Sequence, residues 1–231
     1  MCVSIAAGTS KPVGSPTAEC RLPLRDLEAM IDELRTERLL LRPLTLDDAD
    51  AYFRVYGDPR TWEHLPSSRH TSRAMSVDAI ERAIAGRLEY GFSHNAVFLR
   101  EPVGALPAGA FLGSAGARML DFDAWNLGYR FAPEAWGRGF ATEAARASLT
   151  AAQTTRPDTP VTARVLGDNA ASIRVIERIG LELQWRGRAA RLGGSDDEHS
   201  STPGTTTHLD RVIYADRALG DEMLDAVIAL G

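Results

Sequence analysis

The hydrophobic pattern around residue 40 predicts a strand followed directly by a helix. Residues 37–44, ERLLLRPL, are a short apolar run, and Pro43 ends it because proline cannot donate to a strand ladder. Thr45 with Asp48 three residues later is typical of a helix N-terminus, since the acid can satisfy first-turn N–H groups. The buried face of that helix is predicted to be Ala49, Tyr52, Phe53 and Tyr56.

Later segments continue to alternate between strand and helix periods. Ser76 is placed to cap a second helix, whose predicted apolar face is Ile80, Ala83, Ile84 and Leu88. Three apolar runs then predict an antiparallel meander, with strands at residues 96–99, 110–117 and 125–131. The remaining predicted elements are helix 141–153, strand 161–166, helix 170–179 closed by Gly180, strands 181–190 and 209–215, and helix 221–230. This order predicts a single mixed α+β domain.

The same pattern gives the predicted domain bounds. The periodic segments lie within residues 36–219, and a C-terminal helix is expected at residues 220–231. Residues 1–35 are interpreted as a tail, because most of them mix Gly, Ser, Thr and Pro without a period, although apolar spacing over residues 24–34 favours a short helix. Gly, Ser, Thr and acidic residues fill residues 193–204, which predicts a mobile hairpin tip.

Composition narrows the function classes. The chain has 231 residues, of which 44% are hydrophobic and 25% charged, as in ordinary globular proteins, and its net charge of −5 gives no electrostatic case for nucleic-acid binding. No apolar run approaches the roughly 20 residues that a bilayer span needs, and the opening MCVSIAAG lacks the features of a signal peptide. We therefore expect a cytoplasmic protein with no membrane partner. Because both cysteines, Cys2 and Cys20, precede the domain, neither a disulfide framework nor a cysteine metal site is expected.

The segment PEAWGRGFATEAA, residues 133–145, carries the clearest candidate chemistry. Gly137 and Gly139 can adopt positive φ and bring backbone N–H groups against an anion. Arg138 between them adds a cation, and the helix predicted from Ala141 adds the positive end of its dipole. The segment therefore predicts a cradle for a pyrophosphate.

Two other phosphate-binding designs fit this segment poorly. A Walker loop requires Gly-Lys-Ser/Thr, whereas Phe140-Ala141-Thr142 follows Gly139. A dinucleotide-binding fold requires glycine or alanine where Thr142 stands, and an acid at the end of the next strand. Asp158 has nearly the right spacing but lies in a proline-flanked turn before that strand.

Four short segments in order resemble the GCN5-related N-acetyltransferase (GNAT) superfamily, and within it the branch of ribosomal-protein N-terminal acetyltransferases. They are residues 36–43 (TERLLLRP), 127–144 (LGYRFAPEAWGRGFATEA), 169–172 (NAAS) and 179–181 (IGL). The resemblance spans residues 36–219. It implies an α+β domain in which helices flank a mixed, mostly antiparallel sheet. The sheet is splayed between two parallel strands, residues 127–131 and 161–166.

The resemblance also implies acetyl-CoA as co-substrate. No metal is expected, because His199 and His208 lack the spacing of metal ligands. The pyrophosphate of acetyl-CoA would lie on Trp136, Gly137, Arg138, Gly139, Phe140, Ala141 and Thr142. Its pantetheine arm would bond to the backbone near Phe131 and to Asn169. The family's loop signature ends as Gly139 and Ala141 do here but begins with Gln or Arg. Trp136 at that first position leaves the backbone cradle intact.

The catalytic residues of the superfamily match this sequence less closely than its cofactor-binding residues do. The usual general acid of the superfamily is a tyrosine seven residues after the asparagine, and that position is Ile176 here. The resemblance implies Ser172 as the proton donor to the leaving sulfur, and a backbone N–H near Phe131 as the oxyanion donor. Ser172 could equally support its helix, and Asn169 could be a turn residue alone. Candidates for the acceptor site are Glu63, His64 and His70, and a water relay is an alternative base.

The function predicted from this resemblance is transfer of an acetyl group from acetyl-CoA to a primary amine, with direct attack in a ternary complex. A protein N-terminus is the favoured acceptor. One alternative is a small-molecule amine such as an antibiotic, a polyamine or an amino acid. A second alternative is a non-catalytic acyl-CoA sensor. The protein is expected to be a monomer or a homodimer.

Overall fold

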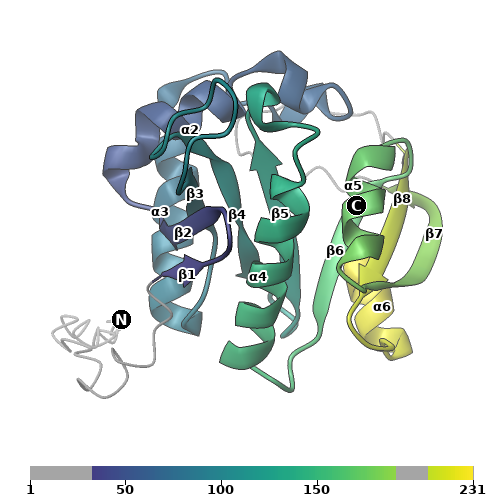
Figure 1. Ribbon diagram of the computed structural model, residues 1–231. Coiled ribbons are helices and arrows are strands. Elements are labelled where there is room, and N and C mark those ends of the chain that lie inside the picture. Colours follow the sequence, from purple (N-terminus) through teal and green to yellow (C-terminus); the bar gives the residue numbers. More distant parts are fainter. Residues whose placement is uncertain (1–32, 191–207, 231) are drawn as a thin grey trace, which may run out of the picture. The chain divides into compact units, whose positions relative to one another are not determined.

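The computed structural model describes residues 33–190 and 208–230 and contains one mixed sheet (Figure 1). Within these residues eight strands lie in the order β1-β2-β3-β4-β5-β6-β8-β7. Their bounds are β1 Leu34–Arg35, β2 Leu39–Pro43, β3 Asn95–Leu99, β4 Phe111–Met119, β5 Trp125–Phe131, β6 Val161–Leu166, β7 Glu182–Ala190 and β8 His208–Ala215. All neighbouring pairs are antiparallel except β5 and β6, which are parallel. The predicted mixed, mostly antiparallel sheet is confirmed.

Helices cover both faces of the sheet. They are α2 Ala49–Tyr56, α3 Arg73–Tyr90, α4 Phe140–Thr155, α5 Ala170–Arg178 and α6 Asp221–Ala229, with 3₁₀ turns η1 Leu46–Asp48, η2 Pro59–Trp62, η3 Pro66–Ser68 and η4 Pro133–Ala135. Because successive side chains of a strand point to opposite faces, β3 shows how the faces differ. Val97 and Leu99 pack in a cluster with α4, whereas Ala96 and Phe98 pack with α2 and α3.

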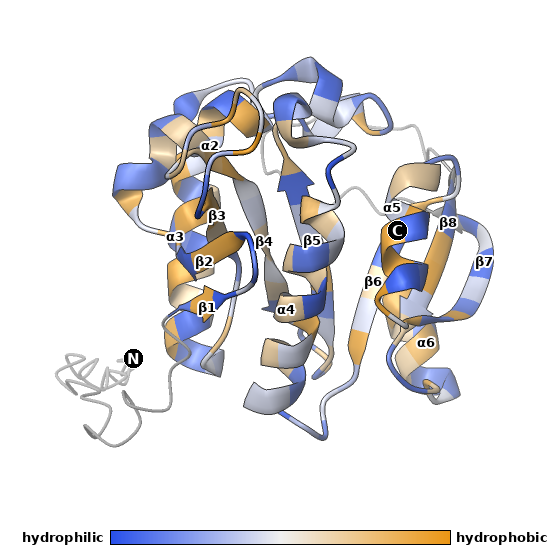
Figure 2. Ribbon diagram, in the orientation of Figure 1, coloured by the Kyte–Doolittle hydropathy of each residue, from blue (hydrophilic) through white to orange (hydrophobic). Residues whose placement is uncertain are grey.

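The edge strand β7 differs in polarity from the inner strand β2. Figure 2 shows β2 as largely hydrophobic and the edge strand β7 as largely hydrophilic. Polar residues on an edge strand discourage pairing with another chain. The hydrophobic core therefore lies under the central strands, where the largest fully buried side chains include Trp125, Phe140 and Leu41.

The two parallel strands separate soon after they meet. Trp125 pairs with Val161 and Asn126 pairs with Thr162, and the register goes no further. Beyond Asn126 the strands diverge, and we call the gap between the ends of β5 and β6 the splay. The predicted splay between residues 127–131 and 161–166 is confirmed.

Some local predictions are wrong. Ser72, not Ser76, caps α3, since its Oγ accepts from the Met75 N–H at 3.4 Å and the helix begins at Arg73. Ser76 is buried inside the helix, and Leu88, predicted on its buried face, is 57% exposed. Both serines precede plausible helical spacing, so local pattern alone could not choose between them.

The first strand lies just before the predicted start of the domain at residue 36. Leu34 and Arg35 form β1 and pair with β2, so the sheet begins before residue 36, and Leu34 is not helical. The rest of the short helix expected over residues 24–34, and the hairpin tip at 193–204, lie outside the described residues. In the first helix Val55, rather than Phe53, joins Ala49 and Tyr52 as a buried residue.

Candidate functional site

The glycine loop before α4 has the backbone that the sequence predicted. Gly137 has φ 73° and Gly139 has φ 80°, both in the left-handed region that L side chains rarely adopt. A Cβ at Gly137 would meet nothing within 4 Å, so conformation and not space requires glycine there. Gly139 is the N-cap of α4 and offers no side chain to the first-turn N–H groups. These N–H groups are therefore open to an anion, and we call residues 136–142 the cradle.

A brace from the start of β2 holds the cradle in place. The Glu143 carboxylate accepts from Thr36 Oγ1 at 2.6 Å, from the Arg38 backbone N–H at 2.8 Å and from Arg38 Nε at 2.8 Å. Arg38 Nη1 donates to the Arg138 carbonyl at 2.9 Å, and its guanidinium lies over the Phe140 ring. Two of the segments that resemble GNAT proteins therefore touch each other.

The brace also fixes the charge of Glu143. Burial alone would raise the pKa of this carboxyl, but the hydrogen bonds from Thr36 and Arg38 outweigh burial and lower the pKa below its usual value. Glu143 is therefore an anion at neutral pH and stabilises the first turn of α4, where the helix dipole favours negative charge.

Trp136 ties the cradle to the end of β5. The residue is 49% exposed and is therefore not part of the buried core. Instead its Nε1–H donates to the Phe131 carbonyl at 2.8 Å. Arg138 is exposed, and its Nε donates to the Glu134 carbonyl at 3.4 Å.

Backbone donors of β5 face the splay. The Ala132 N–H donates to the Leu112 carbonyl at 2.8 Å, toward β4. Since successive N–H groups in a strand point to opposite edges, those of Tyr129 and Phe131 point toward β6. Phe131 thus offers a backbone N–H in the position that the sequence analysis expected.

Asn169 and Ser172 stand across the splay at the start of α5. Asn169 caps the helix, because its Oδ1 accepts from the Ser172 N–H at 3.0 Å. The Ser172 hydroxyl oxygen lies 2.9 Å from the Tyr129 hydroxyl oxygen, and Tyr129 also donates to the Ser172 carbonyl at 3.1 Å. A hydroxyl pair therefore links β5 to α5.

Tyr129 is the functional candidate that the sequence analysis missed. Burial raises the pKa of its hydroxyl to about 12, although the hydrogen bond with Ser172 lowers it. Ile176, which occupies the superfamily's usual tyrosine position, is 2% exposed in the core. The chain thus has a phenol beside the splay, supplied by a strand instead of the helix. Tyr129 lies within residues 127–144, one of the segments that resemble GNAT proteins, but its partner Ser172 is 43 residues away in the sequence.

The three acceptor-site candidates lie in different environments. Glu63 and His64 are exposed on the turn after η2. His64 Nδ1 lies 3.7 Å from Asp168 Oδ1, so this turn reaches the end of β6, next to Asn169. His70 instead is 8% exposed, and its Nδ1 is 2.8 Å from the Ser76 hydroxyl.

His70 belongs to a group of side chains that we call the aromatic cluster: Tyr52, Tyr56, Trp62, His70 and Arg130. The centroid of the His70 ring lies 5.0 Å from that of Tyr56 and 6.3 Å from that of Trp62. Burial, helped by the nearby Arg130 charge, lowers the pKa of His70 to about 4. His70 is therefore neutral at physiological pH and too weak a base to suit proton abstraction.

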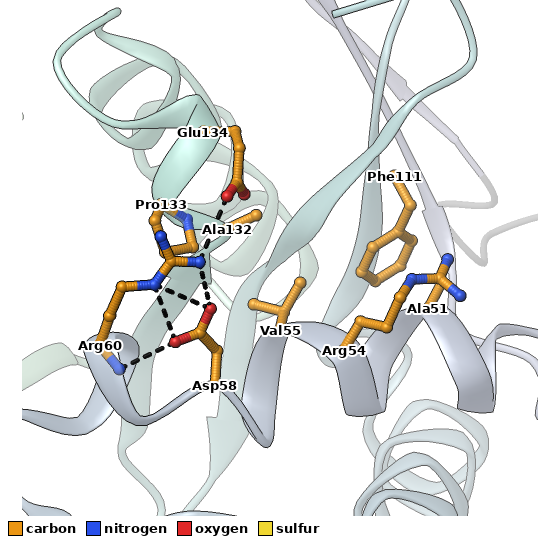
Figure 3. A pocket seen from close by; sticks show the side chains of 9 residues that line it. All are labelled: Ala51, Arg54, Val55, Asp58, Arg60, Phe111, Ala132, Pro133 and Glu134. Carbon is orange, nitrogen blue, oxygen red and sulfur yellow. Dashed lines mark hydrogen bonds and ion pairs between the residues drawn. The ribbon is translucent and has the colours of Figure 1, made fainter.

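A surface pocket lies beside the start of the cradle and contains none of the predicted site residues. Figure 3 shows Arg60 within it, between Asp58 and Glu134. Arg60 Nη2 lies 2.6 Å from Asp58 Oδ2 and 3.3 Å from Glu134 Oε1. This exposed pair of contacts joins η2 to η4 but, being screened by water, adds little stability.

Residues 33–190 and 208–230 contain neither a cluster of metal ligands nor a membrane-spanning helix. No three His, Cys, Asp or Glu side chains there gather as metal ligands do. No helix in the same ranges has the length and apolarity that a bilayer span requires.

A mixed sheet that splays beside a glycine-flanked helix N-terminus is the architecture expected of an acetyltransferase. The chain belongs to the GNAT acetyltransferase family, because the family's sequence model, Acetyltransferase (GNAT) domain, matches residues 38–182. It is thus an enzyme of the N-acetyltransferase class.

Individual relatives agree with this family. The uncharacterized N-acetyltransferase p20 of Bacillus licheniformis is 25% identical over 156 residues, covering 67% of this chain and 84% of that protein. A solved acetyltransferase from Agrobacterium tumefaciens str. C58 has a TM-score of 0.58 at 24% identity, covering 90% of this chain and 98% of that one. RimL, a ribosomal L7/L12 alpha-N-protein acetyltransferase solved with coenzyme A, has a TM-score of 0.59 at 16% identity, covering 80% and 97%. The two structural likenesses show the fold.

Proposed function

We propose that this enzyme transfers the acetyl group of acetyl-CoA to a primary amine, with a protein N-terminus as the favoured acceptor. The observation that carries the proposal is the cradle: two glycines at positive φ leave the N-terminus of α4 open at the end of the splayed strand. The RimL neighbour, solved with coenzyme A, supports the choice of ligand and of acceptor.

The residues present fit acetyl-CoA. In our proposal, backbone N–H groups of the cradle and the α4 dipole hold its pyrophosphate, and Arg138 adds a cation at the exposed rim. The Phe131 N–H, which faces the splay, would bond the pantetheine arm or the reacting oxygen. Asn169 keeps its amide nitrogen for the arm, because its cap to α5 uses only its oxygen.

Acetyl-CoA supplies an acetyl group activated as a thioester. The Tyr129–Ser172 pair suits the leaving sulfur, since the Tyr129 proton can be shared between the hydroxyl and carbonyl oxygens of Ser172 while the Ser172 hydroxyl proton is donated outward. A free thiol titrates near ~8.5, far below Tyr129 at about 12, so the proton remains on oxygen. We therefore assign the pair a hydrogen-bonding role that stabilises negative charge, and not complete proton transfer.

His64 is the best of the three candidates for receiving the proton of the acceptor amine. It is exposed to solvent, and Asp168 lies within 3.7 Å of its Nδ1, where a carboxylate can orient the imidazole. His70 is buried and neutral, so we assign it to packing in the aromatic cluster. Within residues 33–190 and 208–230 no hydrogen bond or ion pair orients the exposed Glu63, and we give it no role.

Two measurements test the proposed function. Calorimetry should detect acetyl-CoA binding, and thiol release should rise above the hydrolysis blank when amines or peptides are added. No binding at millimolar ligand would contradict the cradle. Binding without thiol release for any acceptor would contradict transfer and would instead indicate a sensor.

A further inference from the structure

Arg130 is a partly buried cation on β5. Tyr129 reaches α5, and since neighbouring side chains of a strand point to opposite faces, Arg130 points toward η2. Its guanidinium carbon lies 3.2 Å from the centroid of the Trp62 ring and 5.5 Å from that of Tyr56. Its Nη1 donates to the Thr61 carbonyl.

No carboxylate pairs with Arg130 in the part of the chain that the structure describes. The contrast with two other arginines is clear. Arg42 holds Asp48 through two hydrogen bonds of 2.8 and 2.7 Å, and Arg38 holds Glu143 in a similar manner. The groups around Arg130 are aromatic rings and one backbone carbonyl, and burial lowers the pKa of its guanidinium.

Burying a cation without an anion is unfavourable, and a fold retains such a group more readily when a ligand completes the pair. A guanidinium has five N–H donors in a planar fork that matches a carboxylate, and Thr61 accounts for one bond. The Trp62 face fixes the plane of the fork. Among residues 33–190 and 208–230 the cluster therefore presents an oriented cation without a carboxylate partner.

The position of Arg130 indicates which ligand would supply the anion. Arg130 directly precedes Phe131, whose N–H faces the splay, and it contacts η2, after which His64 follows. The α4 end of the cradle packs on the face of the sheet opposite α2. Since the cradle would hold the pyrophosphate of acetyl-CoA, we take the anion at Arg130 to belong to the acceptor.

We propose that Arg130, Trp62 and the Thr61 carbonyl form an anion subsite, so that the preferred acceptor carries a carboxylate near its amine. This inference rests on the proposed function. Two sources share this chemistry: a peptide N-terminus with an acidic second residue, and a free amino acid. Polyamines and aminoglycosides are disfavoured, because a second cation would be repelled by Arg130.

Binding of matched acceptors to the CoA-saturated protein tests the subsite without requiring turnover. Calorimetry compares the C-terminally amidated peptides Ser-Asp-Ala and Ser-Asn-Ala, and separately serine with serinamide. We expect the carboxylate member of at least one pair to bind about tenfold more tightly, as a charge-assisted bidentate bond would give. The pair that shows the preference identifies the source of the anion. Equal affinities within both pairs would overturn the proposal.

Variants show whether Arg130 causes the preference. Arg130→Gln should abolish it, and Arg130→Lys should keep only part, since lysine has the charge but not the fork. Arg54→Gln, which removes an exposed charge from α2, should leave it intact. A preference that survives Arg130→Gln overturns the subsite. Circular dichroism checks that Arg130→Gln folds. If it does not fold, the carboxylate preference of Arg130→Lys is compared with that of wild type. An undiminished preference in Arg130→Lys overturns the role of the guanidinium fork.

Thiol release in the same samples separates this inference from the proposed function. A carboxylate preference in binding with no thiol release for any acceptor would contradict the transferase and support the subsite. Equal kcat/KM for charged and neutral acceptors, unchanged by Arg130→Gln, would overturn the subsite while the transferase stands.

Discussion

The cradle and the aromatic cluster flank the same end of β5 but are built from different groups. The cradle is backbone: two glycines at positive φ and the open N–H groups of α4, braced by Glu143. The aromatic cluster is made of side chains from α2, η2, the loop before α3 and β5. A backbone grip suits a phosphate, whereas oriented side chains suit a ligand of particular charge and shape. Substitutions in each region test this division.

Gly139→Asp should remove acetyl-CoA binding, with a loss on the order of 100-fold. The added carboxylate would occupy the N–H groups of α4 and repel a phosphate. Calorimetry measures the affinity, and circular dichroism checks the fold. Gly139→Asn is the matched control, because it has nearly the same shape without the charge and should lose less affinity. Equal losses in the two variants would show that the dipole and the charge do not matter there.

Tyr129→Phe and Ser172→Ala should each lower kcat by about tenfold, the effect of one lost hydrogen bond to a charged group. The acetyl-CoA affinity should change little. Because the two hydroxyls act as a pair, the double variant should lose less than the product of the single losses. Fully multiplicative effects on kcat would argue that the two residues act independently.

Glu143→Gln should destabilise the fold by about 1–3 kcal/mol, since Arg38 and Thr36 lose a charged partner. Because the pKa of Glu143 is lowered by folding, its contribution is present above the ordinary value of 4.5 and is lost as pH falls through the folded pKa. Urea unfolding at pH 7 and pH 3 measures this, and the difference from wild type should shrink at pH 3. Glu33→Gln, which breaks only an exposed pair with Arg35, is the control and should have no effect.

His70→Gln should make the protein less sensitive to mild acid. Folding lowers the pKa of His70 from 6.5 to about 4, so the folded state loses stability as pH falls from 6.5 toward 4. Allowing for solvent screening, we expect wild type to lose about 1 kcal/mol more than His70→Gln between pH 7 and pH 5. Urea unfolding of wild type and His70→Gln, each measured at pH 7 and pH 5, tests this. Identical pH slopes for the two proteins would show that His70 is not held neutral by the aromatic cluster.

The cradle could be predicted from sequence because its causes are local. Positive φ requires glycine, and Gly137 and Gly139 stand immediately before a good helix former. The strands 125–131 and 161–166 were predicted with their observed bounds, because short apolar runs bounded by turn residues leave little choice.

The side-chain contacts of the site could not be predicted from the sequence. Tyr129 meets Ser172 and Arg130 meets Trp62 only after the sheet forms, across 43 residues in the first case. Hydrophobic periodicity predicts helices and strands but not contacts between residues far apart in the sequence. The prediction that Ser76 caps the second helix was wrong for a related reason. Ser76 is buried by tertiary packing, and Ser72 is the cap.

A crystal structure with CoA bound tests the central claim most directly. We predict that the pyrophosphate oxygens lie within hydrogen-bond distance of backbone N–H groups in residues 136–142, with the pantetheine arm in the splay beside Tyr129 and Ser172. A pyrophosphate bound elsewhere on the protein, with the cradle N–H groups facing only water, would contradict the account.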